Sequence, residues 1–184
     1  MKTRIFLDPG HGGADTGCVA DNGEIQEATL VLQIAEEMVR LAQTSTLVDY
    51  AISRFSWEKL PKLDRARRAK AFRADAALSL HFNAIANPLT NRTDLFSIGK
   101  VPPFFERKVL DLGMNLPFRQ TSVTPFFYPR VWNCLRHYKS FSIPAVLLEI
   151  AFLDRPLTLE YLSDGGVEKI AKSLHNWVEE SARS

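Results

Sequence analysis

The chain has 184 residues, of which 46% are hydrophobic and 24% are charged, and its formal net charge at pH 7 is +2. This length and composition suit one packed globular domain that covers residues 1–184. So small a net charge gives no reason to expect a nucleic-acid partner, and no apolar run approaches the ~18 residues that span a membrane. Cys18 and Cys134 lie far apart, which predicts neither a disulfide framework nor a thiolate metal site.

The first predicted strand, residues 2–7, runs directly into a Gly-rich turn with the sequence DPGHGG, residues 8–13. Three glycines and a proline impose an unusual backbone path there, which directs His11 outward from the end of the strand. Open α/β folds bind their ligands at such strand ends. Taken alone, the turn is as compatible with a phosphate site or an unliganded loop as with metal binding or catalysis.

Helices and strands alternate through the middle of the chain. Apolar residues spaced as on one face of a helix, and short apolar runs, predict a helix, a strand, a helix and a strand over residues 31–41, 47–52, 60–74 and 76–82. Glu27 stands just before the first of these helices. The last strand ends at His81, so a second histidine lies at a strand end, with Asn83 just beyond it.

The second half of the chain contains a third polar group in an unusual place. The predicted elements are a strand, a helix, an aromatic-rich segment, a strand and a helix over residues 94–98, 104–116, 117–143, 144–152 and 167–178. The aromatic-rich segment fits irregular core packing or a wall of a substrate cleft. Glu149 interrupts the most apolar strand, where a carboxylate is costly to bury unless it is paired, linked to a metal or protonated.

The alternation of strands and helices predicts an α/β fold. We expect a single domain with a twisted, mostly parallel or mixed sheet of about six strands, covered by helices on both faces.

The polar groups at the strand ends predict a catalytic metal. Two neutral imidazoles and one carboxylate with an open fourth position are a ligand set of catalytic zinc, which His11, His81 and Glu27 could supply. Such an ion can activate water for attack on an amide, and Glu149 is suited to carry the proton, because desolvation raises the pKa of a carboxyl group. Glu24 is an alternative third ligand. The sequence has no GxSxG, HExxH or GxxxxGK[ST] motif.

Separated motifs then occur in a recognisable order: FLDPGHGGADTG, Glu27, ISR at 52–54, LSLHFNA at 78–84 and PAVLLEIAFLD at 144–154. Together they resemble the zinc-dependent N-acetylmuramoyl-L-alanine amidases of the type 3 family, over nearly the whole chain. The resemblance implies that His11, Glu27 and His81 bind one Zn²⁺ ion and that Glu149 is catalytic. It also implies a peptidoglycan substrate, cleaved at the amide between N-acetylmuramic acid and the L-alanine of the stem peptide.

The resemblance also bears on residues around the ligands. It favours Glu27 over Glu24, because its offset to the first helix matches the family. Arg65 and Asp75 match family positions that we interpret as supporting groups. Asn83, Arg136 and His137 are candidate substrate-binding residues, and His175 is predicted to be structural.

The biological setting predicted from the sequence is that of a phage lysin. The 67 residues between His81 and Glu149 leave little room for the plug helix of cell-division members of the family, so we expect an enzyme that needs no activator protein. A monomer is favoured, although the sequence leaves the oligomeric state open. No signal peptide or cell-wall-binding domain is predicted, which favours synthesis in the cytoplasm and action on the periplasmic cell wall after the membrane is permeabilised. The alternatives are the catalytic domain of a host autolysin and a non-catalytic peptidoglycan-binding module. A zinc carboxypeptidase is disfavoured because the short HxxE spacing is absent.

Overall fold

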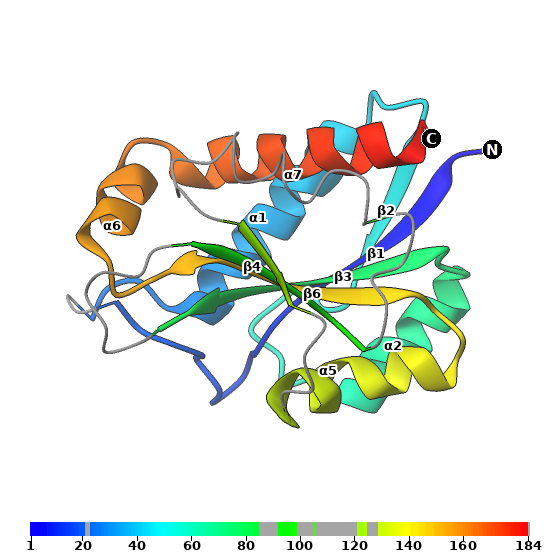
Figure 1. Ribbon diagram of the computed structural model, residues 1–184, viewed down its shortest axis with the longest axis horizontal. Helices are drawn as coiled ribbons and strands as arrows, with labels where there is room; N and C mark the ends of the chain where they lie inside the picture. The colour runs from blue at the N-terminus through cyan, green and yellow to red at the C-terminus, as the bar shows by residue number, and fades with distance from the viewer. Residues whose placement is uncertain (21–22, 85–91, 99–104, 106–120, 125–128, 184) are drawn as a thin grey trace.

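A single six-stranded sheet forms the centre of the computed structural model, in the strand order β2-β1-β3-β6-β4-β5 (Figure 1). The structure describes all residues except 21–22, 85–91, 99–104, 106–120, 125–128 and 184. The strands are β1 (Thr3–Pro9), β2 (Val48–Ile52), β3 (Ala76–Asn83), β4 (Thr93–Ser97), β5 (Thr121–Thr124) and β6 (Ala145–Phe152). The helices in the described parts are α1 (Glu27–Ala42), α2 (Lys62–Phe72), α5 (Pro129–Ser140), α6 (Pro156–Ser163) and α7 (Gly166–Ala182).

The sheet is mixed but mostly parallel, which confirms the predicted fold class. Strands β2, β1, β3 and β6 are parallel to one another, whereas β4 is antiparallel to β6 and parallel to β5. The predicted helix over 104–116 lies outside the described residues, apart from Phe105.

Helices cover both faces of the sheet, because its strands alternate apolar residues toward each side. Figure 1 shows α1 and α7 on one face and α2 and α5 on the other. In β1, for example, Ile5 and Leu7 belong to a core cluster with α1 and α7, whereas Phe6 packs in a second cluster with α2 and α5. The apolar stripe that predicted the first helix is buried in the first of these clusters.

Helix α5 lies inside the aromatic-rich segment for which the sequence predicted either irregular packing or a cleft wall. Its residues Val131, Leu135 and Tyr138 are buried at helical spacing and pack in the second core cluster. Asn133 and Cys134 on the same helix line a cavity. Some residues of this helix pack in the core and others line a cavity, so residues 129–140 form a regular helix in place of the irregular core packing expected there, and the wall of a substrate cleft stays a prediction. Helix α6 was not predicted.

The order of the strands places the site. After β1 the chain passes through α1 to β2 on one side, and after β2 it passes through α2 to β3 on the other side of β1. The carboxyl ends of β1 and β3 are therefore adjacent where the direction of connection reverses, and α/β sheets bind ligands at such a switch point. His11 and His81 lie at these two ends.

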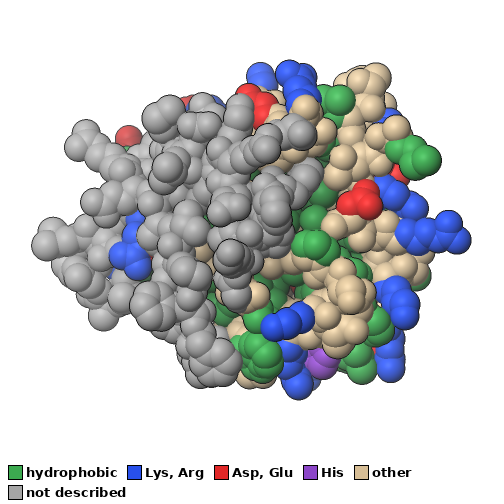
Figure 2. All heavy atoms as spheres, turned by 45° about the vertical axis from the view of Figure 1, so that its right-hand side comes forward, with side chains coloured by type: hydrophobic (Ala, Val, Ile, Leu, Met, Phe, Trp, Pro, Cys, Tyr) green, Lys and Arg blue, Asp and Glu red, His purple; other side chains and the backbone are tan. Residues whose placement is uncertain are grey.

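The described surface agrees with the modest net charge. Figure 2 shows Lys and Arg side chains at several separate places on one face, with Asp and Glu among them rather than gathered into one basic patch. None of the helices in the described parts of the chain is long and apolar enough to cross a bilayer.

Candidate metal centre

The turn after β1 has a strained backbone. His11 has a φ of 61°, in the left-handed region that residues with a Cβ rarely adopt, and Gly12 and Gly13 follow with φ values of 120° and 66°. Consecutive positive φ values curl the chain back at the end of the strand. The His11 side chain is thereby turned toward the start of α1.

Two arginines hold this turn in place. Buried Arg54 donates from its guanidinium to the carbonyl oxygens of Pro9, Gly10 and Ala28, at 3.1, 2.8 and 2.6 Å. Arg65 donates to the Asp8 carboxylate at 2.7 Å and also to the backbone carbonyls of Pro9 and His11. The turn therefore has its shape imposed by side-chain donors from two other parts of the chain.

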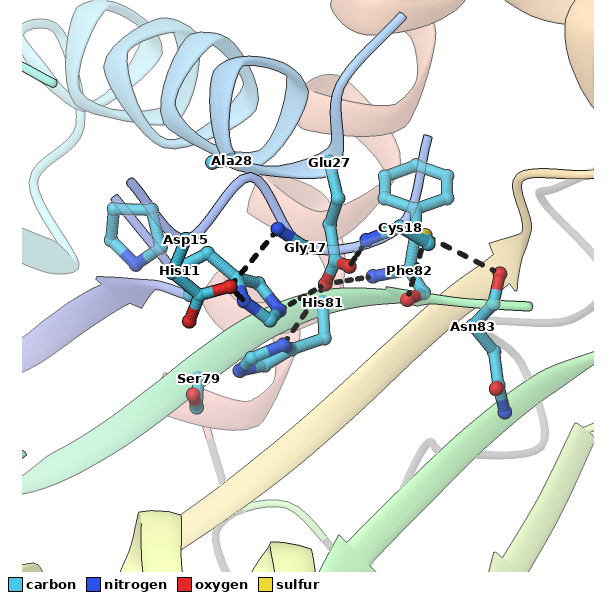
Figure 3. Close-up of polar contacts among 12 residues, drawn as sticks. His11, Asp15, Gly17, Cys18, Glu27, Ala28, Ser79, His81, Phe82 and Asn83 are labelled. Carbon is cyan, nitrogen blue, oxygen red and sulfur yellow. Dashed lines mark hydrogen bonds and ion pairs between the residues drawn. The ribbon is translucent and has the colours of Figure 1, made fainter. Parts of the chain in front are cut away.

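His11, Glu27 and His81 meet in one cluster, as Figure 3 shows. His11 Nε2 and His81 Nδ1 each lie 3.0 Å from Oε1 of Glu27, the first residue of α1. The two imidazole rings are 5.0 Å apart between centroids and steeply inclined. One potential ligand atom from each residue lies within 4.8 Å of the others. Glu24 is exposed and is not part of this cluster.

Hydrogen bonds orient the cluster from outside. The second nitrogen of His11, Nδ1, lies 2.8 Å from Asp15 Oδ1, an oxygen that also accepts from the backbone N–H of Gly17. Glu27 Oε2 accepts from the backbone N–H of Cys18, and Oε1 accepts from that of Phe82. A carboxylate behind a histidine fixes its tautomer and ring orientation, an arrangement typical of metal-binding histidines.

Two glycines leave the space that the cluster occupies. A Cβ at Gly10 would overlap the His81 ring, and a Cβ at Gly17 would overlap Glu27 and come within 2.8 Å of His11 Cδ2. Side chains are thus excluded at both positions by the candidate ligands themselves. Glycine is therefore required at Gly10 and Gly17 because the side chains of the candidate ligands lie so close to their Cα atoms. Gly17 also has a positive φ, which favours glycine.

The charges in the cluster suit a cation. Although burial opposes ionisation of Glu27, hydrogen bonds and charge from His11 and His81 hold the pKa of its carboxyl group well below the ordinary value. Burial likewise opposes protonation of His11, but Glu27 and Asp15 raise the pKa of its imidazole. An ionised carboxylate and two imidazoles converge on one point, which is the donor set of a divalent metal and fits the residues present.

Glu149 lies beside this cluster with an unsatisfied oxygen. It is the Cα partner of His81 across β3 and β6, and both residues line a cavity of about 570 Å³. Its Oε2 is shielded from solvent and has no hydrogen-bond partner among the described residues. Burial, with the negative charges of Glu27 and Asp94 added, raises the pKa of Glu149 to about 7. Such a carboxyl group can accept or release a proton near neutral pH.

A second cavity, of about 230 Å³, adjoins the first on the side of residues 59–62. The two cavities share five lining residues, namely His11, Asp15, Lys62, His81 and Cys134. The cluster therefore lies where two parts of one cleft meet. Burial raises the pKa of the Cys134 and Cys18 thiols, which are free cysteines and not thiolate ligands.

The candidate substrate-binding residues differ in their placement. Asn83 lines the larger cavity, and its side-chain oxygen accepts from the N–H of Ala84. Arg136 and His137 of α5 do not line either of these two cavities, whose α5 wall consists of Val131, Asn133 and Cys134 among the described residues.

The supporting groups expected from the sequence take the following places. Arg65 binds the turn, as described above. Asp75 accepts from the backbone N–H of Arg4 at 2.8 Å and so joins the starts of β1 and β3, away from the cleft. His175 packs against Tyr50, with its Nδ1 3.2 Å from the tyrosine hydroxyl, in the structural role predicted for it.

Sequence reasoning missed Asp15, Arg54 and Lys62. Asp15 could have been found from its position four residues after His11 in a short loop. Arg54 belongs to a motif quoted for the resemblance, but its contacts are with backbone carbonyls, which leave no pattern in a sequence. Lys62 is one of many basic residues on α2, and only the cleft distinguishes it.

An α/β domain with two histidines, a glutamate and a nearby protonatable carboxyl group at its strand ends has the make-up of a metal-dependent hydrolase. The family of N-acetylmuramoyl-L-alanine amidases matches residues 5–180, so the chain belongs to this family.

Individual relatives match parts of the sequence and the whole fold. An amidase named AmiA from Salmonella typhimurium is 35% identical over 97 residues, which are 53% of this chain and 33% of that protein. An endolysin of Bacillus phage SPP1 is 38% identical over 84 residues, 46% of this chain and 32% of that protein. The chain thus spans about a third of the length of these relatives. An N-acetylmuramoyl-L-alanine amidase structure from Clostridium difficile shares the fold, with a TM-score of 0.84, 24% identity and coverage of 100% and 98% of the two chains.

Proposed function

We propose that this chain is the catalytic domain of a zinc-dependent peptidoglycan hydrolase. It cleaves the amide between the lactyl group of N-acetylmuramic acid and the L-alanine of the stem peptide. The observation that carries the proposal is the convergence of His11, Glu27 and His81 beside Glu149 in one cleft. Membership of the amidase family supports the assignment of this amide as the bond that is cleaved.

The metal would be held by His11, Glu27 and His81. When bound, a divalent ion supplies Lewis-acid chemistry for hydrolysis of an amide. Zinc is the ion that we propose, because two imidazole nitrogens and one carboxylate oxygen are a common ligand set of catalytic zinc. Asp15 holds the His11 ring, and Arg54 and Arg65 hold the backbone that carries it.

Glu149 would carry the proton. Its carboxylate takes a proton from the attacking water as the water oxygen bonds to the lactyl carbonyl carbon. The same group then gives this proton to the alanine nitrogen as the C–N bond breaks. The products are a free lactyl carboxyl group and a peptide with a free N-terminal alanine. The unpartnered Oε2 beside His81 is suited to both transfers, because no other described group competes for its lone pairs.

A digest of purified peptidoglycan tests the proposal. Zinc-loaded protein, protein treated with EDTA and the Glu149→Gln variant are compared, and the soluble products are identified by mass spectrometry. We expect free stem peptides that begin with L-alanine from the zinc-loaded protein alone. Released disaccharides would instead mean a glycosidase, and tight binding to peptidoglycan without any product would mean a binding module.

For the biological setting we propose a phage lysin that acts as a monomer, without an activator, on the cell wall of a permeabilised cell. The similarity to a phage endolysin supports this setting, and the similarity to bacterial amidases supports the alternative of a host autolysin domain. Full activity of the purified monomer on peptidoglycan, and lysis of permeabilised cells, are expected. Silence of the purified protein until a partner protein is added would contradict the proposal.

A further inference from the structure

Lys62 occupies a distinctive position in the cleft. It is the first residue of α2, its side chain is exposed, and it lines both the larger and the smaller cavity. Of the five residues that the two cavities share, Lys62 alone carries a permanent positive charge. Lys62 therefore lies on the part of the wall that the two cavities share, together with the candidate ligands His11 and His81.

Two other charged groups near the ligands are already engaged. Arg65 is bonded to Asp8 and to backbone carbonyls, and Asp15 is bonded to His11 and Gly17. Lys62 forms no hydrogen bond or ion pair from its side chain with the described residues. The stability of α2 does not explain a lysine at this position either, because a cation in the first turn of a helix opposes the helix dipole. The lysine therefore offers an unengaged charge to a ligand.

The proposed substrate has one ionised group close to the bond that is cleaved. The lactyl carboxyl group is consumed in the amide, the sugar carries only hydroxyl and acetamide groups, and L-alanine is neutral. The next residue, D-glutamate, continues the stem through its γ-carboxyl group. Its α-carboxylate stays free in some peptidoglycans and is amidated in others. At one to two residues from the scissile amide, this carboxylate lies within ~7 Å of it.

We propose that Lys62 binds the α-carboxylate of the second stem-peptide residue and makes the enzyme selective for D-glutamate over its amidated form. This inference rests on the proposed amidase function. The cleft also contains the carboxyl groups of Glu27, Glu149 and Asp15, which repel an incoming carboxylate. Lys62 offsets that repulsion at the one place where both cavities meet.

Two muropeptides test the assignment. Both are N-acetylmuramoyl tripeptides, and they differ only in whether the α-carboxyl group of D-glutamate is free or amidated. The specificity constant kcat/KM is measured for each with zinc-loaded wild type, Lys62→Met, Lys62→Arg and Lys172→Met. Lys172 is an exposed lysine on α7, on the opposite face of the sheet, so its variant controls for the loss of one charge.

We expect wild type and Lys172→Met to prefer the free carboxylate by about 10-fold, a preference that falls as salt is added. Lys62→Met should bring the ratio to about 1 by losing activity on the carboxylate substrate only, and Lys62→Arg should keep most of the preference. A wild-type ratio near 1, or an equal loss on both substrates in Lys62→Met, would overturn the assignment.

A binding measurement separates this inference from the proposed function. The product peptide L-alanyl-γ-D-glutamyl-L-lysine and its α-amide are titrated into metal-free wild type and metal-free Lys62→Met, and binding is followed by calorimetry. Tighter binding of the carboxylate form to wild type only supports the role of Lys62 even if the zinc-loaded protein cleaves neither muropeptide, a result that would refute the amidase proposal. Equal binding of both peptides to wild type would contradict the role of Lys62 even if cleavage is observed.

Discussion

His81 and Glu149 lie opposite each other as Cα partners on the neighbouring parallel strands β3 and β6. Paired residues of adjacent strands direct their side chains to the same face of a sheet, and both line the larger cavity. A candidate metal ligand and a candidate proton carrier are thus positioned relative to each other by backbone hydrogen bonds of the sheet. This part of the site depends on the core of the fold, whereas His11 depends on a turn.

Glu149→Gln should separate activity from stability. We expect kcat to fall by about 10²–10⁴-fold, because the amide cannot carry the proton, while zinc content is unchanged. The metal-free variant should be as stable as wild type or more stable by about 1 kcal/mol at pH 8, because a buried carboxyl group whose pKa is raised on folding is ionised at that pH and is replaced by a neutral amide. Urea unfolding and metal analysis measure both effects. Glu160→Gln, at an exposed position on α6, is the control. If Glu149→Gln destabilised the protein by more than about 1 kcal/mol, Oε2 of Glu149 would have a stabilising partner, and the prediction would be wrong.

Asp15→Asn should weaken metal binding without unfolding the domain. Asp15 is exposed and its carboxylate contacts His11 Nδ1, so its loss frees the ring and lowers the basicity of the ligand. We expect zinc affinity to fall by about 10–100-fold. Competition with a chromophoric chelator gives the dissociation constant. Asp49→Asn, on the exposed side of β2, should leave the affinity unchanged, and equal affinities for Asp15→Asn and wild type would show that the contact does not position His11.

Gly10→Ala should abolish metal binding by a steric route. The added methyl group would occupy the space of the His81 imidazole, so the ring must leave the cluster. Gly23→Ala is a matched control, because a Cβ there meets nothing within 4 Å, although its φ of 75° costs about 1 kcal/mol of stability. Zinc stoichiometry and thermal unfolding are measured for both. We expect near-zero zinc in Gly10→Ala and full zinc in Gly23→Ala, and a Gly10→Ala protein that retains zinc would show that the turn can move away from His81.

The buried pair of Asp8 and Arg65 should make stability depend on pH. Burial alone would raise the pKa of Asp8, but the charge of Arg65 and hydrogen bonds from Arg65 and Tyr138 hold it below the ordinary value. A group whose pKa is lowered on folding stabilises the protein above its unfolded-state pKa, about 3.9 for aspartate. That stabilisation is lost as the pH falls from there through the folded-state pKa.

Asp8→Asn should therefore be destabilising by about 3–5 kcal/mol at pH 7, because Arg65 is left buried without its counter-charge, and by less at pH 3. Urea unfolding in EDTA at both pH values measures the difference from wild type. Asp64→Asn removes an exposed ion pair with Arg67 and should cost less than about 1 kcal/mol at either pH. A penalty for Asp8→Asn that is the same at pH 3 and pH 7 would contradict the assigned ionisation.

The regular elements of the fold were predictable where one pattern dominated. Helix α1 follows from its apolar stripe, and the buried strands β3 and β6 follow from uninterrupted apolar runs. Helix α5 was missed although Val131, Leu135 and Tyr138 have helical spacing, because aromatic residues and prolines before it obscure where the pattern begins. Helix α6 is short and has no buried stripe that a sequence would reveal.

The candidate site was predictable as a set of residue types and less so as a geometry. The order of motifs pointed to His11, Glu27, His81 and Glu149, which the structure brings to one cleft, whereas residue types alone left Glu24 open. Arg65 was expected as a supporting group from the resemblance, but the contacts that Arg54 and Arg65 make with backbone carbonyls leave no pattern in a sequence. Cleft residues such as Lys62 become visible only when distant segments are placed side by side.

The left-handed backbone of His11 sets the proposed metal binding against the stability of the turn. A residue with a Cβ costs about 1–2 kcal/mol in this region, whereas glycine is tolerated there. In metal-free protein, His11→Gly should therefore unfold at higher urea than His11→Ala, the reverse of the order usually found for these two residues. An alanine variant that is the more stable of the two would show that the turn relaxes once the imidazole is gone. In homologues that have lost hydrolytic activity, we expect position 11 to change to glycine or asparagine, because these residues tolerate the left-handed region. This change should precede changes at the buried residues that surround His11.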